Sequence, residues 1–87
     1  MIDLSKYSFN VENLDFINAL YDDVDNQNEI YLQYGDKTYV LQPSGANIEI
    51  YAYGETLGYF DNLDDALLNF KIDGVPLIEL VPELDFA

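Results

Sequence analysis

The chain has 87 residues, of which 17 are Asp or Glu and three are Lys, with no Arg, His or Cys, so its formal net charge at pH 7 is −14. Without Cys and His it can form no disulfide, and it lacks the usual general base and the commonest transition-metal ligands. Direct binding to nucleic acid or to an anionic membrane is also disfavoured, because three lysines cannot offset seventeen carboxylates near a polyanion.

Residues 1–9 predict a short extended arm that packs onto the body through its two aromatic side chains. Residues 1–6 have neither the basic flank nor the apolar core of a signal peptide, and no apolar run approaches about 18 residues, so we expect a soluble, cytoplasmic protein. An amphipathic helix of about ten residues should follow, capped by Asn10 or Asn13. Its apolar stripe is Leu14, Ile17, Leu20 and Tyr21. Residues 22–28, almost entirely polar, then predict an acidic loop.

Residues 29–53 contain three runs of alternating apolar residues separated by two turn signals, which predicts an antiparallel β-meander. Gly35-Asp36 suits a two-residue turn of type II′, and residues 43–46 provide the second turn. The register fixed by the first turn places Tyr34 opposite Lys37, Leu32 opposite Tyr39 and Ile30 opposite Leu41. Apolar side chains then gather on one face of the sheet. The other face carries Tyr31, Gln33, Thr38, Val40, Gln42, Asn47, Glu49, Tyr51 and Tyr53.

The C-terminal third predicts two helices after a turn at residues 54–58. Residues 58–60 form either a fourth short strand or the entry to the next helix. Asp61 is a suitable N-cap for that helix, whose stripe is Leu63, Ala66, Leu67 and Phe70. It should end by Asp73-Gly74, because Gly suits a left-handed C-terminal residue, and Pro76 can open a further short helix. The order helix, three strands, helix, short helix predicts one α+β domain over residues 1–87, with helices on one face of an antiparallel sheet.

One acidic segment invites a calcium-site interpretation. The spacing Asp23-x-Asp25-x-Gln27-x-Glu29 resembles the opening of an EF-hand loop. Such a loop needs Gly at its sixth position and a bidentate Glu at its twelfth, where this chain has Asn28 and Tyr34. We therefore interpret the segment as an acidic, solvated loop and expect no metal site there.

A second acidic group, Asp61, Asp64 and Asp65, could bind magnesium or act in acid–base chemistry. At the start of a helix, however, the same spacing is what capping and the helix dipole favour. The chain has no phosphate-binding glycine loop, and a single thin layer offers little depth for a substrate cleft. We therefore expect no enzyme activity and no cofactor.

The net charge of −14 exceeds the magnitude of about 2 to 8 that keeps a small domain soluble. Either the source imposes acidity, as a halophile would, or the partner is strongly basic. The outward tyrosines Tyr31, Tyr51 and Tyr53 have two interpretations: ordinary strand residues partly covered by the N-terminal arm, or a protein-binding face, where Tyr is enriched. Flanking carboxylates would steer such a face towards a basic groove.

In size, acidity, lack of Cys and order of elements, the whole chain resembles the small phage-encoded anti-CRISPR proteins that block Cas9 by imitating DNA. The resemblance lies in architecture rather than in a shared motif, so it assigns no site residue. It implies an inhibitor that occupies the basic channel of a CRISPR or restriction nuclease. The alternatives are an immunity or assembly module that binds a basic protein without imitating nucleic acid, and an accessory domain of a mobile element or an acid-rich proteome.

The expected contact residues lie in three acidic groups. They are Asp22, Asp23, Asp25 and Glu29 on the loop before the sheet, Glu49, Tyr51, Tyr53 and Glu55 on the outer sheet face and its following turn, and Asp61, Asp64 and Asp65 at the second helix start.

Overall fold

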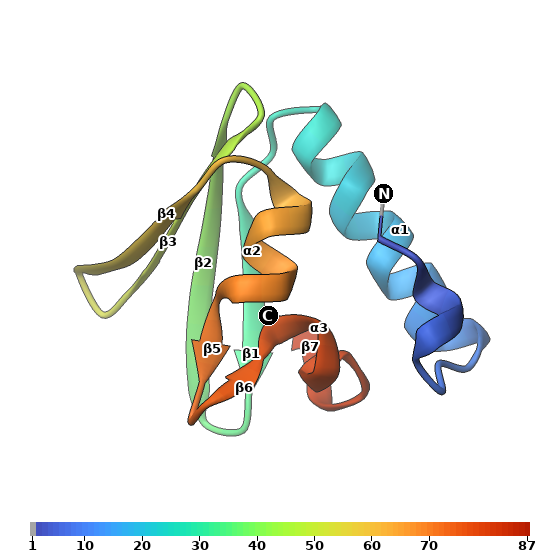
Figure 1. Ribbon diagram of the computed structural model, residues 1–87. Coiled ribbons are helices and arrows are strands. Elements are labelled where there is room, and N and C mark those ends of the chain that lie inside the picture. The colour runs from blue at the N-terminus through green and yellow to red at the C-terminus, as the bar shows by residue number, and fades with distance from the viewer. Residues whose placement is uncertain (1) are drawn as a thin grey trace.

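The computed structural model describes residues 2–87 and confirms an α+β fold with helices packed on one face of an antiparallel sheet (Figure 1). Within these residues the sheet has five strands rather than three or four, in the order β4-β3-β2-β1-β7. They are β1 Ile30–Tyr34, β2 Lys37–Ser44, β3 Asn47–Ala52, β4 Glu55–Phe60 and β7 Leu84–Phe86. The other elements are η1 Leu4–Lys6, α1 Val11–Asp25, α2 Leu63–Asn69, β5 Lys71–Ile72, β6 Val75–Pro76, α3 Leu77–Leu80 and η2 Val81–Glu83.

The register between β1 and β2 is the predicted one, from Tyr34 opposite Lys37 to Ile30 opposite Leu41. Gly35 has φ 60° and the following residue has no positive φ, as a type II′ turn requires. The second turn is shorter than predicted, because Pro43 and Ser44 belong to β2. Since β1 begins opposite Leu41, β2 has no partner on that side at Pro43, where a missing N–H is tolerated.

The inner face of the sheet and the helices enclose one apolar core. Its fully buried side chains come from every layer: Ile17, Leu20, Ile30, Leu32, Leu41, Ile48, Ile50, Leu67, Leu77, Ile78 and Val81. The N-terminal arm packs against this core, with the rings of Tyr7 and Phe9 stacked at 5.1 Å. The arm is not extended throughout, because it contains η1. Since it packs on the core side, it leaves the opposite face of the sheet uncovered.

Helix α1 is longer than predicted and includes the segment expected to be an acidic loop. Asn10 is its N-cap: Asn10 Oδ1 accepts from the N–H of Asn13 at 2.8 Å, and Asn13 Oδ1 accepts in return from the N–H of Asn10. Val24 extends the buried stripe by one more turn, which holds the aspartates of residues 22–25 in helical conformation. The helix ends at Asp25 with Asn26 as its C-cap, and Gln27 just beyond it has φ 58°.

Helix α2 also differs from prediction at both ends. Asn62, not Asp61, is the N-cap, and the helix ends at Asn69 because Phe70 is extended and buried. Asp73-Gly74, with φ 53° and 80°, forms the type I′ turn of a small β5–β6 hairpin instead of a helix end.

The C-terminus adds a strand that was not predicted. Pro82 lies in η2, and β7 then pairs with β1, with Leu84 opposite Tyr34. The ring of Phe86 packs on that of Phe16 of α1 at 4.4 Å.

None of the helices in residues 2–87 is long and apolar enough to span a membrane.

Candidate interaction surface

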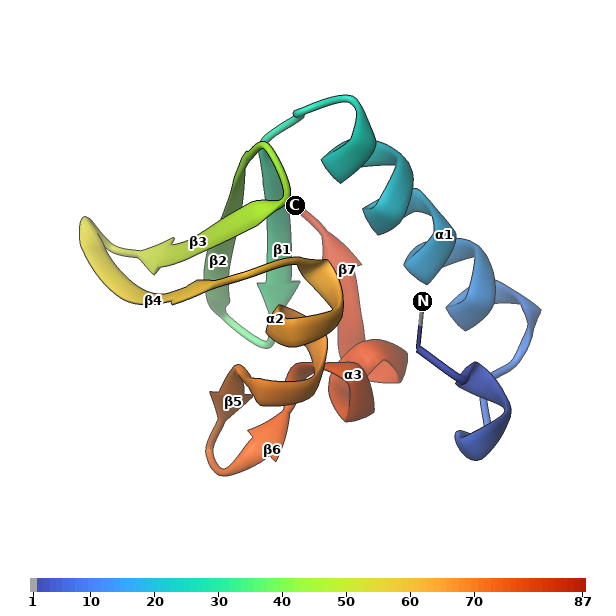
Figure 2. The same ribbon diagram turned by 45° about the horizontal axis from the view of Figure 1, so that its top comes forward.

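The face of the sheet opposite the helices, here called the outer face, carries the aromatic and acidic side chains predicted to point outward. It comprises Tyr31 and Gln33 of β1, Thr38, Val40 and Gln42 of β2, Glu49 and Tyr51 of β3, Thr56 and Tyr59 of β4, and Asp85 of β7. In both ribbon views the helices lie on the other side of the sheet, and the β3–β4 hairpin projects away from them (Figures 1 and 2).

The centre of the outer face is the cross-strand row of Tyr31, Val40 and Tyr51. Both tyrosine hydroxyls donate to the carboxylate of Glu29, Tyr51 to Oε2 at 2.8 Å and Tyr31 to Oε1. Val40 is only 8% exposed although it lies outside the main core, as expected for a small side chain between two rings. The row therefore holds a surface carboxylate in a fixed place against an aromatic patch.

The hydrogen bonds in this row shift the pKa values of all three groups. The bond from Tyr31, followed by that from Tyr51, lowers the pKa of Glu29. The hydrogen bond to Glu29 is the main cause of the raised pKa of Tyr31. The corresponding bond from Tyr51 is the main cause that raises the pKa of Tyr51 to about 12. Glu29 consequently remains ionised, and both phenols remain donors, across the physiological pH range.

A second row, Gln42, Glu49 and Tyr59, lies beside the first. Glu49 accepts from the hydroxyl of Thr56 at 2.6 Å, and Tyr59 is 76% exposed. Two hollows of about 490 and 320 Å³ lie on this part of the face, and both are lined by Gln42 and Glu49. The outer face is thus grooved rather than flat.

The hairpin turn beside these rows presents Tyr53 and Glu55. Tyr53 and Gly54 have φ 54° and 77°, the signs of a type I′ turn, and the Tyr53 side chain is 75% exposed. Its hydroxyl accepts from the N–H of Thr38 at 3.4 Å. No lysine lies on the outer face: Lys37 is on the inner side by strand alternation, and the other two lie outside the five-stranded sheet.

The remaining predicted residues lie elsewhere. Asp22, Asp23 and Asp25 are on the last turns of α1, which corrects their assignment to a loop. Asp65 accepts from the N–H of Asp61 at 3.0 Å and from Asn69 at 2.7 Å, and these bonds, the first being the larger cause, lower its pKa. The hydrogen bond between Asp61 and Asp65 therefore lies at the start of α2, where Asn62 and not the predicted Asp61 is the N-cap.

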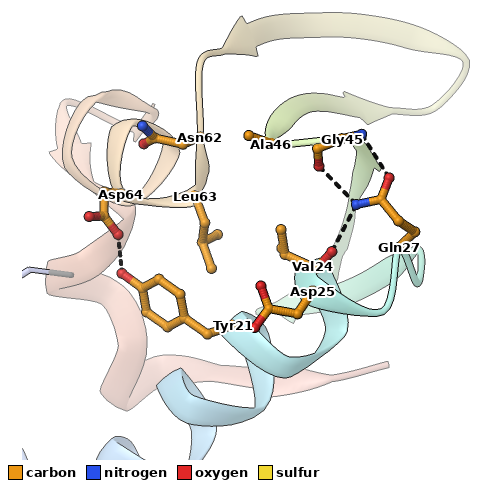
Figure 3. A pocket seen from close by; sticks show the side chains of 9 residues that line it. All are labelled: Tyr21, Val24, Asp25, Gln27, Gly45, Ala46, Asn62, Leu63 and Asp64. Carbon is orange, nitrogen blue, oxygen red and sulfur yellow. Dashed lines mark hydrogen bonds between the residues drawn. The ribbon is translucent and has the colours of Figure 1, made fainter.

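Asp25 and Asp64 border a cleft of about 570 Å³ between the end of α1, the β2–β3 turn and the start of α2 (Figure 3). The Tyr21 hydroxyl donates to Asp64 Oδ1, and burial, together with this bond, raises the pKa of Tyr21. Gln27 closes the other side: Nε2 donates to the carbonyls of Val24 and Gly45 at 2.9 and 2.8 Å, and Oε1 accepts from the N–H of Gly45 at 2.7 Å.

Three residues of the outer face or of the cleft were missing from the predicted contact residues. Tyr31 was detectable from strand alternation, which placed it outward. Tyr59 depended on whether residues 58–60 form a strand, which the sequence left open. Nothing in the sequence around Gln27 indicated its contact with Gly45, 18 residues away.

Within residues 2–87 no group of three or more His, Cys, Asp or Glu side chains is arranged to hold a metal ion. No family model matches the chain, and no curated protein or solved structure matches it significantly.

Proposed function

We propose that this protein is an acidic inhibitor that occupies the basic nucleic-acid-binding groove of a cytoplasmic nuclease, such as a CRISPR or restriction nuclease, and acts by occupancy rather than catalysis. The observation that carries the proposal is the density of surface charge. None of the carboxylates in residues 2–87 is buried, and the molecule's longest dimension is 33 Å. Duplex DNA of that length carries about 19 phosphates, at roughly one per 1.7 Å. The net charge of −14 is therefore about three quarters of that of the duplex.

The outer face supports this proposal because two carboxylates on and beside it are already hydrogen-bonded before binding. Hydrogen bonds already fix the carboxylates of Glu29 and Glu49, so little side-chain entropy is lost when a basic groove engages them. The exposed tyrosines add stiff amphipathic area of the kind enriched at binding hot spots.

One observation favours the alternative, an immunity or assembly module. At the centre of the outer face lies a single aromatic anchor, formed by Tyr31 and Tyr51 over Val40, whereas a strict mimic would present rows of carboxylates. Both functions would use the same face and the same electrostatic steering. They differ in whether nucleic acid competes for the partner.

Competition with DNA separates the two functions. Tagged protein is incubated with lysate containing CRISPR and restriction nucleases and washed at low and then moderate salt, with and without duplex DNA. We expect a nuclease to be retained and then displaced by DNA. Retention of a basic partner that DNA does not displace would establish the alternative, and absence of any retained partner would overturn both.

Two charge-matched variants locate the contact face. One carries Glu29→Lys, Glu49→Lys and Glu55→Lys on and beside the outer face. The control carries Asp15→Lys, Glu79→Lys and Glu83→Lys, all exposed and in the helical layer. Three reversals of two units each take the net charge from −14 to −8 in both variants. We expect the outer-face variant to bind at least about tenfold more weakly than the control. An equal loss of binding in the two variants would show that only the net charge of the protein matters and not the position of the carboxylates.

A further inference from the structure

The cleft at the end of α1 is separate from the outer face and has the composition of a binding site for an amphipathic cation. Its volume of about 570 Å³ lies in the range of about 300–1,000 Å³ typical of ligand sites. Val24, Ala46 and Leu63 provide apolar lining from three different elements. Figure 3 shows Leu63 and Val24 pointing into the space and the carboxylate of Asp25 between Val24 and Tyr21.

Negative charge converges on this cleft from two sides. Asp25 lies at the end of α1 and Asp64 in the first turn of α2, and both line the cleft. The C-terminal end of α1 adds roughly half a negative charge, which no basic residue in its last turn offsets, whereas the positive partial charge at the start of α2 is met by Asp64 and Asp65. Among the residues that the structure describes, none that lines the cleft is a lysine.

Hydrogen bonds hold the walls of the cleft in place, and these bonds can stay formed when a ligand binds. Tyr21 fixes the carboxylate of Asp64 on one side. On the other, the Gln27 amide ties the end of α1 to the backbone of Gly45. An occupant therefore meets a preformed site and bears little cost of ordering it.

We propose that this cleft binds the side chain of an arginine presented by a protein partner, with the alkyl stem on Val24 and Leu63 and the guanidinium group between Asp25 and Asp64. Arginine fits better than lysine because its guanidinium is planar, is more weakly hydrated and stacks on aromatic rings such as that of Tyr21. It also forms paired hydrogen bonds with carboxylates. The site does not depend on the proposed inhibitor function.

The proposal can be tested with butylguanidinium as probe, by following amide chemical shifts of the intact protein in an NMR titration. We expect shifts concentrated at Val24, Asp25, Ala46 and Leu63. Butylguanidinium should bind about tenfold more tightly than guanidinium itself, because part of its alkyl chain is buried on the apolar lining. Equal affinities, or shifts spread evenly over the surface, would show only counterion binding and overturn the proposal.

A matched pair of variants tests the carboxylate. Asp25→Asn should weaken butylguanidinium binding about tenfold, through loss of a charge-assisted hydrogen bond. Asp15→Asn, exposed on the same helix and equal in charge change, should leave it unchanged. Equal effects in the two variants would refute the site. If Asp25→Asn perturbs folding, Tyr21→Phe offers a second test, since releasing Asp64 should also weaken binding.

The source of the cation is tested with N-acetyl-arginine amide. This compound carries the same side chain on a peptide backbone, so we expect it to bind as tightly as butylguanidinium. If N-acetyl-arginine amide does not bind, the cleft accepts only small free cations, and the assignment to a protein partner is overturned. Since no nuclease is used, either result is independent of the pull-down.

Discussion

Replacing Gln27 by Ala should destabilise the protein by about 2 kcal/mol, because it removes three hydrogen bonds worth roughly 0.5–1 kcal/mol each at a partly exposed site. These bonds join the end of α1 to the turn between β2 and β3, two elements otherwise linked through the core. In a domain of this size, a loss of about 2 kcal/mol lowers the melting temperature by roughly 8–16 °C. Thermal and urea unfolding followed by circular dichroism would measure it.

A Gly substitution separates the side-chain contacts from backbone strain. Gln27 has φ 58°, a left-handed conformation that costs a residue with a side chain about 1–2 kcal/mol and costs Gly almost nothing. Gln27→Gly loses the same three bonds but recovers part of that strain, so it should be less stable than the wild type and more stable than Gln27→Ala. The greater entropy of Gly in the unfolded chain reduces the recovery.

The control for both variants is Gln42→Ala, which removes an exposed Gln side chain that makes no hydrogen bond within residues 2–87. Its stability should match the wild type to within about 0.5 kcal/mol. The reasoning fails if Gln27→Gly is at least as stable as the wild type, since strain would then outweigh the contacts. It also fails if the Ala and Gly variants are equally stable.

Three further predictions concern charge. Glu29→Gln should move the pKa of Tyr51 from about 12 towards 10.0, measurable by carbon NMR of the tyrosine ring, whereas the charge-matched Glu12→Gln should not. Folding raises the pKa of Tyr51, so the bond from Tyr51 to Glu29 stabilises the protein below pH 10, and this stabilisation is lost as the pH rises towards about 12. Folding lowers the pKa of Glu29, so the stabilisation contributed by the Glu29 carboxylate is lost as the pH falls below 4.5. Asp22→Lys should stabilise the protein by about 0.3–1 kcal/mol at low salt by complementing the dipole at the end of α1. A gain that persists at high salt would contradict this electrostatic cause.

Alternation along the chain predicted the part of the fold built from neighbouring segments. The Gly35-Asp36 turn and the side-chain period of two fixed the β1–β2 register, because a slip of one residue would expose Ile30 and Leu32. The same alternation placed Glu49, Tyr51 and Tyr31 on the outer face. Local sequence is sufficient for these residues because their pairing partners lie only a turn away.

Other local signals were present but had two meanings. Asp73-Gly74 suits both a helix end and a type I′ hairpin turn. The hairpin forms because Phe70 leaves the helix to pack edge-on against Tyr39 and Phe60, with ring centroids 6.0 Å away in each pair. Likewise, α1 continues through an acidic segment because Val24 of that segment is buried in the core.

The sequence by itself determined the charge, the strand alternation and the presence of an acidic, tyrosine-rich face, since these depend on composition and on neighbours along the chain. Only the tertiary structure decided that Leu84–Phe86 completes the sheet, that Tyr31 and Tyr51 share the carboxylate of Glu29, and that Asp25 and Asp64 face one cleft. The two bordering aspartates are 39 positions apart in the chain, and only packing of both helices on one core brings them together.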